Sequence, residues 1–411
     1  MRHAPRPLLP WLAVTLALAA SPAAAQEADD GWGQQRGAQA LDSLEDLLKA
    51  RIRTIPGTDV RWLVAGYLQL DAIWTRHELT GDEQDTFLVS AIPFDPASAN
   101  TRLNIRASQI NFLTQTPTPI GPITTVVQAD LFRYDAGAKP NLNLALVDLN
   151  RNVTVGKAYA TFMDDAVLPT TLDYNGPSGA VFVRQWLARV SVPIGESVRV
   201  EAAVEQPKDD ESAAGRVLSA STSADRPDFA ARARYESDRL HLQLSGVSSA
   251  TRGQLDVLGN TVASKRFDGA GASASAAITL ANGDRVLGQA TTGRGIARYF
   301  NDGLSSVGSV ALTPSGLEQI RVSGAFLYYE RNWSDRWKST FGGSVLWSGG
   351  TDGRRPASDL KQLDYVSANL VYRLARNLFV GGEVLWGRAT EVSGERADDT
   401  RVQVSVRYMI Y

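Results

Sequence analysis

From residue 60 to the last residue, apolar and polar side chains alternate with a period of two. In residues 240–245, three leucines alternate with His, Gln and Ser, and residues 401–410 show the same pattern with Val, Tyr and Ile. Successive side chains of a strand point to opposite faces, so each run predicts a strand with one apolar face. Runs of about ten residues are typical of a transmembrane barrel that is apolar outside and polar inside. Strands of soluble sandwiches are usually shorter.

Short and long connections alternate strictly between these runs. The short turn signals are at residues 117–122, 150–152, 193–197, 236–239, 282–285, 332–336 and 375–377. The long polar or Gly-rich segments are at residues 76–100, 133–141, 162–180, 207–226, 250–268, 293–316, 349–361 and 388–398. Outer-membrane barrels have short periplasmic turns and longer external loops. The pattern therefore predicts an all-β fold, a 16-stranded antiparallel transmembrane β-barrel over residues 60–411, with both ends on the periplasmic side.

The first 25 residues have the pattern of a secretory signal peptide. Arg2 and Arg6 precede an apolar run over residues 8–20, and three alanines follow at positions 23–25. A basic start, a short apolar core and a small-residue cleavage site are the parts of an export signal. We therefore expect export to the cell outer membrane after cleavage, and we assign residues 26–59 to a periplasmic segment.

This segment contains a short run with helical spacing. Within residues 37–55, Leu41, Leu44 and Leu48 repeat at the interval of a coiled-coil seam. Two heptads are too few to be stable alone, so the helix needs a partner surface. The partner surface belongs either to the helix's own domain or to further copies of the chain, in which case these leucines form a seam where the copies meet.

Composition narrows the possible chemistry. The 411 residues include 42 Lys and Arg, 44 Asp and Glu, three His and no Cys. A near-neutral balance argues against a nucleic-acid partner, which would require a basic excess. His77 and His241 are the histidines left after processing, on opposite sides of the membrane, and no G-x-S-x-G motif accompanies them. We therefore expect no catalytic residues, no metal, no cofactor and no enzyme activity.

The polar faces of the strands carry more basic than acidic residues. On the assumption that apolar faces point outward, eleven basic residues face the lumen: Arg106, Arg189, Arg199, Arg232, Arg234, Arg285, Arg321, Lys338, Arg373, Arg401 and Arg407. The acids assigned to the same face are Asp71, Asp130, Glu201, Glu205 and Glu383. A positive pore selects anions, and the arginine fork suits carboxylates. Alternatively, these arginines pair with inward acids and only stiffen the wall.

The third long connection, residues 162–180, mixes apolar anchors with turn formers and acids. We expect this loop to fold into the barrel and form the constriction, with Asp164, Asp173 and Tyr174 on the loop. Arg184 and Arg189 lie on the strand that leaves it. A barrel of this size is wide enough to hold an aqueous channel.

Several segments resemble the DcaP-type trimeric outer-membrane porins. Residues 67–72 (YLQLDA) are similar to the opening strand of that family. The other matching segments are residues 161–164, 168–169, 172–179, 183–185, 295–302 and 383–388. The resemblance implies a trimeric channel for small anions, notably dicarboxylates, with a periplasmic helix that supports the seam at Leu41, Leu44 and Leu48. Lys157 stands where the family pattern leads us to expect Gln, and we add it to the candidate pore-lining residues.

Together these patterns predict a porin, a diffusion channel for small anionic solutes that sits in outer-membrane lipid as a homotrimer. The alternatives are a general or differently selective porin, or a non-conducting structural or adhesin barrel. A siderophore-type transporter would need a much longer N-terminal plug than the residues before Val60 can supply.

Overall fold

The computed structural model describes residues 53–81, 83–95, 97–132, 138–207, 218–257, 260–302, 308–352 and 354–410. The predicted signal peptide and Leu41, Leu44 and Leu48 lie outside these residues. The helix predicted to reach residue 55 is wrong at its end, because Arg53–Thr54 forms a short strand, β1, that pairs with β2. Within the described residues, no helix is long and apolar enough to cross a membrane.

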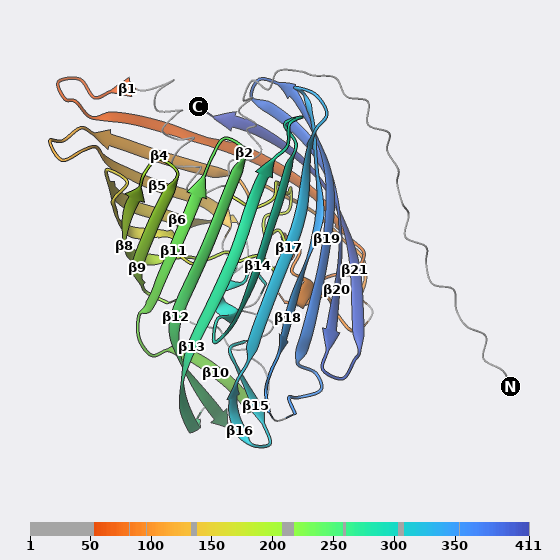
Figure 1. The fold of residues 1–411 in the computed structure, drawn as a ribbon. Coiled ribbons are helices and arrows are strands. Elements are labelled where there is room, and N and C mark those ends of the chain that lie inside the picture. The colour runs from red at the N-terminus through yellow and green to blue at the C-terminus, as the bar shows by residue number, and fades with distance from the viewer. Residues whose placement is uncertain are drawn as a thin grey trace.

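The predicted 16-stranded antiparallel barrel is confirmed (Figure 1). Two positions in the wall are each filled by two strands, because β3 and β4 both pair with β2, and β10 and β11 both pair with β12. The wall consists of β2 (Arg61–Thr75), β3 (Asn100–Asn104) with β4 (Gln109–Thr116), β5 (Ile123–Phe132), β6 (Ala138–Leu149), β7 (Val153–Tyr159), β8 (Arg184–Ile194), β9 (Val198–Glu205), β10 (Leu218–Ala224) with β11 (Asp228–Glu236), β12 (Leu240–Val257), β13 (Asn260–Thr279), β14 (Arg285–Arg294), β17 (Arg321–Asn332), β18 (Trp337–Gly349), β19 (Leu360–Ala375), β20 (Leu378–Glu391) and β21 (Arg396–Ile410).

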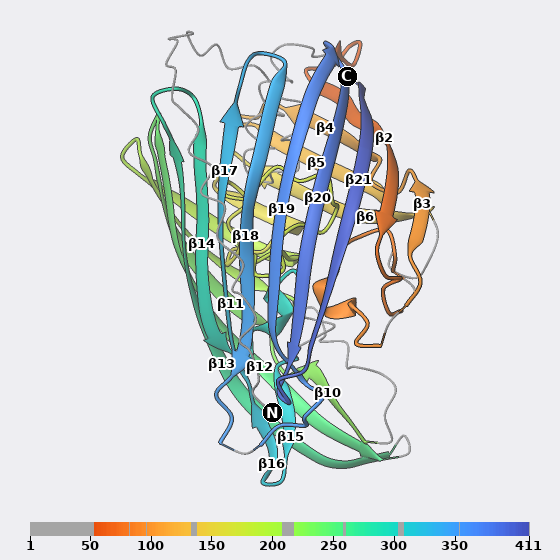
Figure 2. The ribbon, with the colours of Figure 1, turned by 90° about the vertical axis from the view of Figure 1, so that its right-hand side faces the viewer.

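The first and last strands of the wall close the barrel. β2 pairs with β21 from Gly66↔Ile410 to Thr75↔Arg401, and Figure 2 shows the two strands side by side. Closure leaves no edge strand with unpaired backbone groups, which is the condition for a sheet to cross a bilayer. A separate hairpin, β15 (Val310–Thr313) with β16 (Gly316–Gln319), lies outside the wall at the end with the long loops.

The seven short turns lie where the sequence predicts them. One of them joins β6 to β7 through Asn150 and Arg151, both with positive φ, as a tight type I′ hairpin requires. Two predicted long loops are shorter than expected. Most of residues 250–268 belongs to β12 and β13, which stay paired through Arg252↔Arg266, and most of 388–398 belongs to β20 and β21. Gly, Ser and Asp in these segments suggest loops, but the backbone ladder continues through them.

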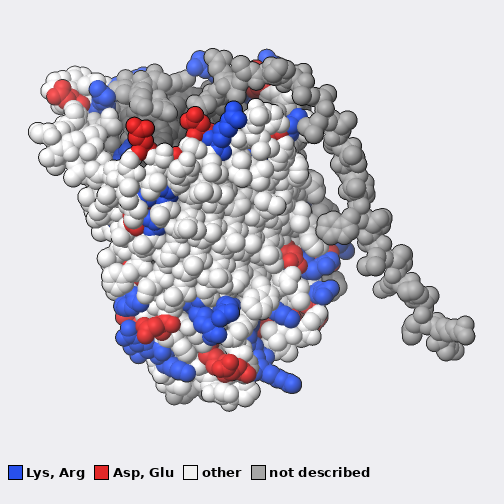
Figure 3. Space-filling view, in the orientation of Figure 1, with Lys and Arg blue, Asp and Glu red and all other residues white. Residues whose placement is uncertain are grey.

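The outer face of the barrel carries an apolar band. Leu68, Phe112, Trp186, Leu244 and Leu327 are among the large apolar side chains exposed there. Figure 3 shows this band as a surface nearly free of Lys, Arg, Asp and Glu, with charged side chains gathered toward its two ends. Such a band is what a bilayer core requires of a barrel.

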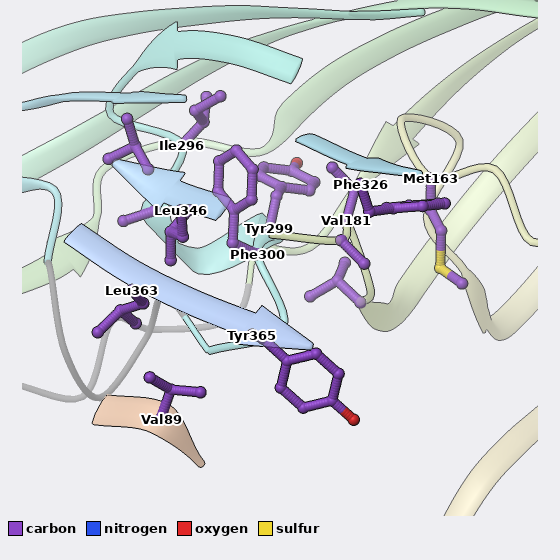
Figure 4. Packing of buried hydrophobic residues seen from close by; sticks show 14 of the residues in the cluster. Val89, Met163, Val181, Ile296, Tyr299, Phe300, Phe326, Leu346, Leu363 and Tyr365 are labelled. Carbon is purple, nitrogen blue, oxygen red and sulfur yellow. The ribbon is translucent and has the colours of Figure 1, made fainter. Parts of the chain in front are cut away.

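Three long loops fold inward and pack on the inner wall. They are the first loop (residues 76–99, with the 3-10 turn η1, Val89–Ala91), the third loop (160–183) and the start of the sixth loop (295–302, with η2, Ala297–Tyr299). Figure 4 shows side chains from the three loops meeting those of the wall in one apolar cluster. Its labelled members are Val89, Met163, Val181, Ile296, Tyr299, Phe300, Phe326, Leu346, Leu363 and Tyr365.

Candidate pore and third loop

The first part of the third loop is attached to the wall by two aspartates, Asp164 and Asp165. The Asp164 carboxylate accepts hydrogen bonds from His241 Nε2 at 2.8 Å and from Ser275 Oγ at 2.5 Å, and Arg234 donates to Asp165 at 2.8 Å. Burial raises the pKa of Asp164, but the His241 hydrogen bond and the Arg234 charge outweigh it and lower the pKa to about 2. Asp164 is therefore ionised throughout the physiological range.

His241 connects this loop to the short-turn end of the barrel, which the sequence predicts to be periplasmic. Its Nδ1 lies 2.5 Å from the Glu236 carboxylate, while its Nε2 lies 2.8 Å from Asp164. An ionised carboxylate can only accept hydrogen bonds, so with both partners ionised each ring nitrogen must carry a hydrogen. The imidazole is then a cation held between two anions.

Further along, wall carboxylates bind backbone amides of the third loop. Glu330 accepts from the Thr170 amide at 3.0 Å and the Thr170 hydroxyl at 2.7 Å. Glu383 accepts from the amides of Leu172 and Asp173, each at 2.8 Å. Hydrogen bonds to a charged acceptor are stronger than neutral ones, and here they fix the loop backbone rather than a mobile side chain.

The tip of the loop reaches the opposite part of the wall. The Tyr174 hydroxyl donates to Asp130 on β5 at 2.5 Å, and its ring stacks on Phe132 with 3.8 Å between centroids. Asp173 accepts from the amide of Phe87 in the first loop at 2.9 Å. Burial raises the pKa of Asp173 despite the nearby Arg401. The third loop therefore crosses the lumen instead of lying along one sector of wall.

The last part of the third loop contacts the wall through its backbone at Gly179. A Cβ at Gly179 would lie 2.3 Å from the carbonyl oxygen of Val345 and 2.9 Å from that of Ala325. Real Cβ atoms do not come so close to backbone oxygen, so only glycine fits this contact. The Gly179 amide also donates to Ser344 at 3.2 Å.

The sixth loop is attached by a buried ion pair. Both carboxylate oxygens of Asp228 accept from Arg298, at 2.6 and 2.7 Å, and one also accepts from the Tyr299 hydroxyl at 2.6 Å. Arg298 is 1% exposed and Asp228 is fully buried. The sequence alone assigns no role to Arg298, Tyr299 or Asp228, although residues 295–302 belong to the segments that resemble the porin family.

Asp302 joins all three inward loops. It accepts from the amide and hydroxyl of Ser90 in the first loop, at 3.1 and 2.5 Å, and from the Ser178 hydroxyl in the third loop at 3.2 Å. Burial raises the pKa of Asp302 to about 6, although these hydrogen bonds lower it.

This shift predicts a pH-dependent contact between the loops. The Asp302 carboxyl binds its proton more tightly when the sixth loop is docked on the other two loops than when it is in solvent. The docked state is therefore most stable below about pH 4, and it loses this stabilisation as the pH rises through about 6. Amide-exchange protection of residues 296–302, corrected for intrinsic rates, should fall roughly tenfold between about pH 5 and pH 7.5. Asp302→Asn should remove most of this dependence; an equally steep profile in the variant would contradict the assignment.

Many predicted lumen arginines are paired with acids. Arg106 binds Glu83 and Asp85 of the first loop, Arg232 and Arg189 share Glu201, and Arg401 lies 3.9 Å from Asp173. The predicted basic excess for the whole interior is wrong, because the inward loops bring their own acids. Further acids on inner faces escaped the sequence assignment, namely Asp148, Asp228, Glu330 and Asp399.

Two predicted pore-lining residues are on the other side of the wall. Lys157 shares a face of β7 with the outward Val155 and lies directly opposite the outward Trp186, so its assignment to the lumen is wrong. Arg321 is exposed on the outer face of β17, because the apolar Val322, Phe326 and Tyr328 point inward against the loops. Apolar–polar alternation assigns the two faces of a strand incorrectly where loops fill the lumen.

Arg184 is the first residue of β8. It donates a hydrogen bond to Asn143, and its guanidinium lies 4.9 Å from the centre of the Phe182 ring.

A basic excess remains at the periplasmic end. Within three residues of the short-turn ends of their strands, the inward positions carry the basic residues Arg61, Arg199, Arg234, Arg285, Lys338, Arg373 and Arg407. Among the described residues, the acids at the same level are Asp148, Glu201, Glu236 and Glu330. We call the seven basic residues the periplasmic ring.

The closed 16-stranded barrel with an inward third loop is the fold of outer-membrane porins. In fold, the chain is similar to the outer membrane channel DcaP of Acinetobacter baumannii, with a TM-score of 0.74 and 16% identity over 87% of this chain and 99% of that one. The anion-selective porin from Comamonas acidovorans (TM-score 0.52, 11% identity, 85% and 100%) and OmpT of Vibrio cholerae in its trimer form (0.53, 12%, 85% and 99%) are also similar.

At these identities the likeness concerns the fold. No protein-family model matches the sequence, and no curated protein sequence matches it. The resemblance to DcaP-type porins seen in the sequence is thus confirmed for the architecture of the barrel.

Proposed function

We propose that this protein is an outer-membrane porin through which small anionic solutes, dicarboxylates among them, diffuse passively. The observation that carries the proposal is the periplasmic ring, where seven basic side chains face four acids on the inner ends of the strands. A single-sign excess at a mouth raises the local concentration of the opposite ion and favours its passage. The pore needs no cofactor for this process.

The spacing of arginines on the inner wall supports dicarboxylates as permeants among the small anionic solutes. Arg199 on β9 lies directly opposite Arg234 on β11, and Arg373 and Arg407 each lie directly opposite Phe379 on β20, one on either side. Each guanidinium can donate two parallel hydrogen bonds to one carboxylate. A solute with two carboxylates can therefore use two neighbouring arginines at once, with weak contacts that still permit release.

Charge removal at the ring tests this proposal. In planar bilayers under a KCl gradient, the wild-type reversal potential should show anion preference, and Arg199→Gln with Arg373→Gln should shift it several-fold toward cation permeability. Arg321→Gln is the matched control, because it removes one positive charge from the outer face. Cation preference in the wild type, or an equal shift in the control, would contradict the proposed role.

A general porin with little selectivity is the second candidate. It is favoured by the acids of the first and third loops, which pair with Arg234 of the periplasmic ring and with Arg106 and Arg401 elsewhere in the lumen. A reversal potential near zero in the wild type, with a large conductance, would favour this candidate.

We further propose a homotrimer, an exported precursor cleaved after residue 25, and the absence of enzyme activity. The trimer is supported by the fold shared with a porin described in trimer form. A channel role without catalysis is supported by the two described histidines, which lie at opposite ends of the barrel. His77 is 3.4 Å from Asp399, and His241 is held by Asp164 and Glu236.

A further inference from the structure

Five arginines lie side by side on the outer surface at the end with the long loops. They are Arg226 before β11, Arg252 on β12, Arg266 on β13, Arg294 on β14 and Arg321 on β17. We call them the arginine belt. Figure 3 shows Lys and Arg gathered over the lower ends of these strands, at the edge of the apolar band.

Cross-strand pairing places like charges in contact positions within the belt. Arg252 is directly opposite Arg266, and Arg294 is directly opposite Arg321. Like charges directly opposite on one face destabilise a sheet. Such an arrangement is favourable when an anion lies between the two guanidinium groups.

Among the described residues, ion pairs with acids neutralise only two of the five arginines of the belt. Asp225 binds both Arg252 and Arg266, and Arg266 also reaches Asp268 at 3.4 Å. Arg294 and Arg321 form no ion pair within the described residues, and Arg294 donates only to the Gln319 carbonyl, at 3.5 Å. Three strands along the wall from Arg321, the outward Arg388 differs, because Asp364 and Asp398 lie directly opposite it on the two neighbouring strands.

The height of the belt matches the outer headgroup region of a bilayer. On the outer face of β17, Tyr329 belongs to an aromatic group at the periplasmic end, with its ring 5.4 Å from Phe341. Arg321 is eight residues away on the same face. At about 3.3 Å per residue and a tilt of about 40°, this separation is roughly 20 Å along the barrel axis, close to the height of an apolar band of about 25 Å.

We propose that the arginine belt binds the phosphate groups of a phosphorylated glycolipid in the outer leaflet. Arginine donates paired hydrogen bonds to phosphate. The belt adjoins the apolar band, so a lipid can place its chains against Leu244 and Leu327 while its phosphates lie at Arg294 and Arg321. A second copy of the chain is disfavoured as the occupant, since it would bring the same positive charges together.

Binding of lipid A to the full-length protein in detergent micelles tests the site. Each arginine near a charged lipid surface is worth about 1 kcal/mol, or about fivefold in affinity, so Arg294→Gln with Arg321→Gln should weaken diphosphoryl lipid A binding by roughly 30-fold. Arg388→Gln is the matched control and should leave binding unchanged. Unchanged single-channel conductance of the double variant shows that the barrel is still folded.

Three results would overturn the proposal. They are wild-type affinity in the double variant, an equal loss in Arg388→Gln, and equally tight binding of dephosphorylated lipid A. Millimolar inorganic phosphate should not displace the lipid; complete displacement would indicate a site for free anions instead. Self-association of the wild type that is lost in the double variant would indicate that a second copy of the chain is the occupant.

Discussion

Deleting residues 168–174 is expected to raise the single-channel conductance about twofold or more. These residues contain the backbone that Glu330 and Glu383 hold and the Tyr174 side chain that reaches Asp130 across the lumen. Conductance of a wide aqueous pore rises with its open cross-section, and a 16-stranded barrel is wide without an obstruction. Recordings in planar bilayers at fixed salt measure the change.

A shortened β15–β16 hairpin provides the matched control, because residues 310–319 form a separate two-stranded sheet outside the wall. Its conductance should stay at the wild-type value. A milder variant, Glu383→Gln, keeps the loop length but weakens two hydrogen bonds, and should increase current fluctuations without changing the fully open level as much. Wild-type conductance in the deletion variant would show that the third loop does not form the constriction.

Replacing Asp228 by Ala is expected to cost about 3–5 kcal/mol in the free energy of unfolding. The change leaves the Arg298 guanidinium buried without its carboxylate and removes the acceptor of the Tyr299 hydroxyl. Removing one partner of a buried pair is costly because the other keeps an uncompensated charge. Urea unfolding in detergent, followed by tryptophan fluorescence, measures the shift.

Two comparisons separate this effect from a general loss of charge. Asp398→Ala breaks an exposed pair, Arg76–Asp398 at 3.6 Å, and should cost less than about 1 kcal/mol. The double variant Asp228→Ala with Arg298→Leu should recover much of the loss, since apolar replacements of a buried pair are often tolerated. Equal costs for Asp228→Ala and Asp398→Ala would contradict the buried-pair explanation.

The wall of the barrel could be predicted from the sequence because its signals are local. Period-two alternation identifies strands, and tight turns such as Asn150–Arg151 are encoded by the turn residues themselves. The strand ends were less predictable where backbone pairing continues through Gly, Ser and Asp residues that are typical of loops, as in β12 and β13.

The lumen could not be predicted in the same way, because its chemistry depends on contacts between distant residues. Arg321 was assigned inward on the rule that apolar faces point to lipid, yet Val322 and Phe326 pack on inward loops. Arg106 and Arg401 looked unpaired, because their partners Glu83 and Asp173 come from loops whose path alternation does not encode. Roles for Arg298 and Asp228 needed the fold.

The anchoring of the third loop has a consequence for the order of assembly. Its partners on the wall come much later in the chain, with Thr170–Glu330 separated by 160 residues, Leu172–Glu383 by 211 and Leu172–Gln403 by 231. Contacts between such distant residues form slowly, because the intervening chain must be ordered first. The loop can therefore complete its docking only after β17–β21 have been added. Interactions made this late mainly slow unfolding, so the loop that narrows the pore should also prolong the lifetime of the closed barrel.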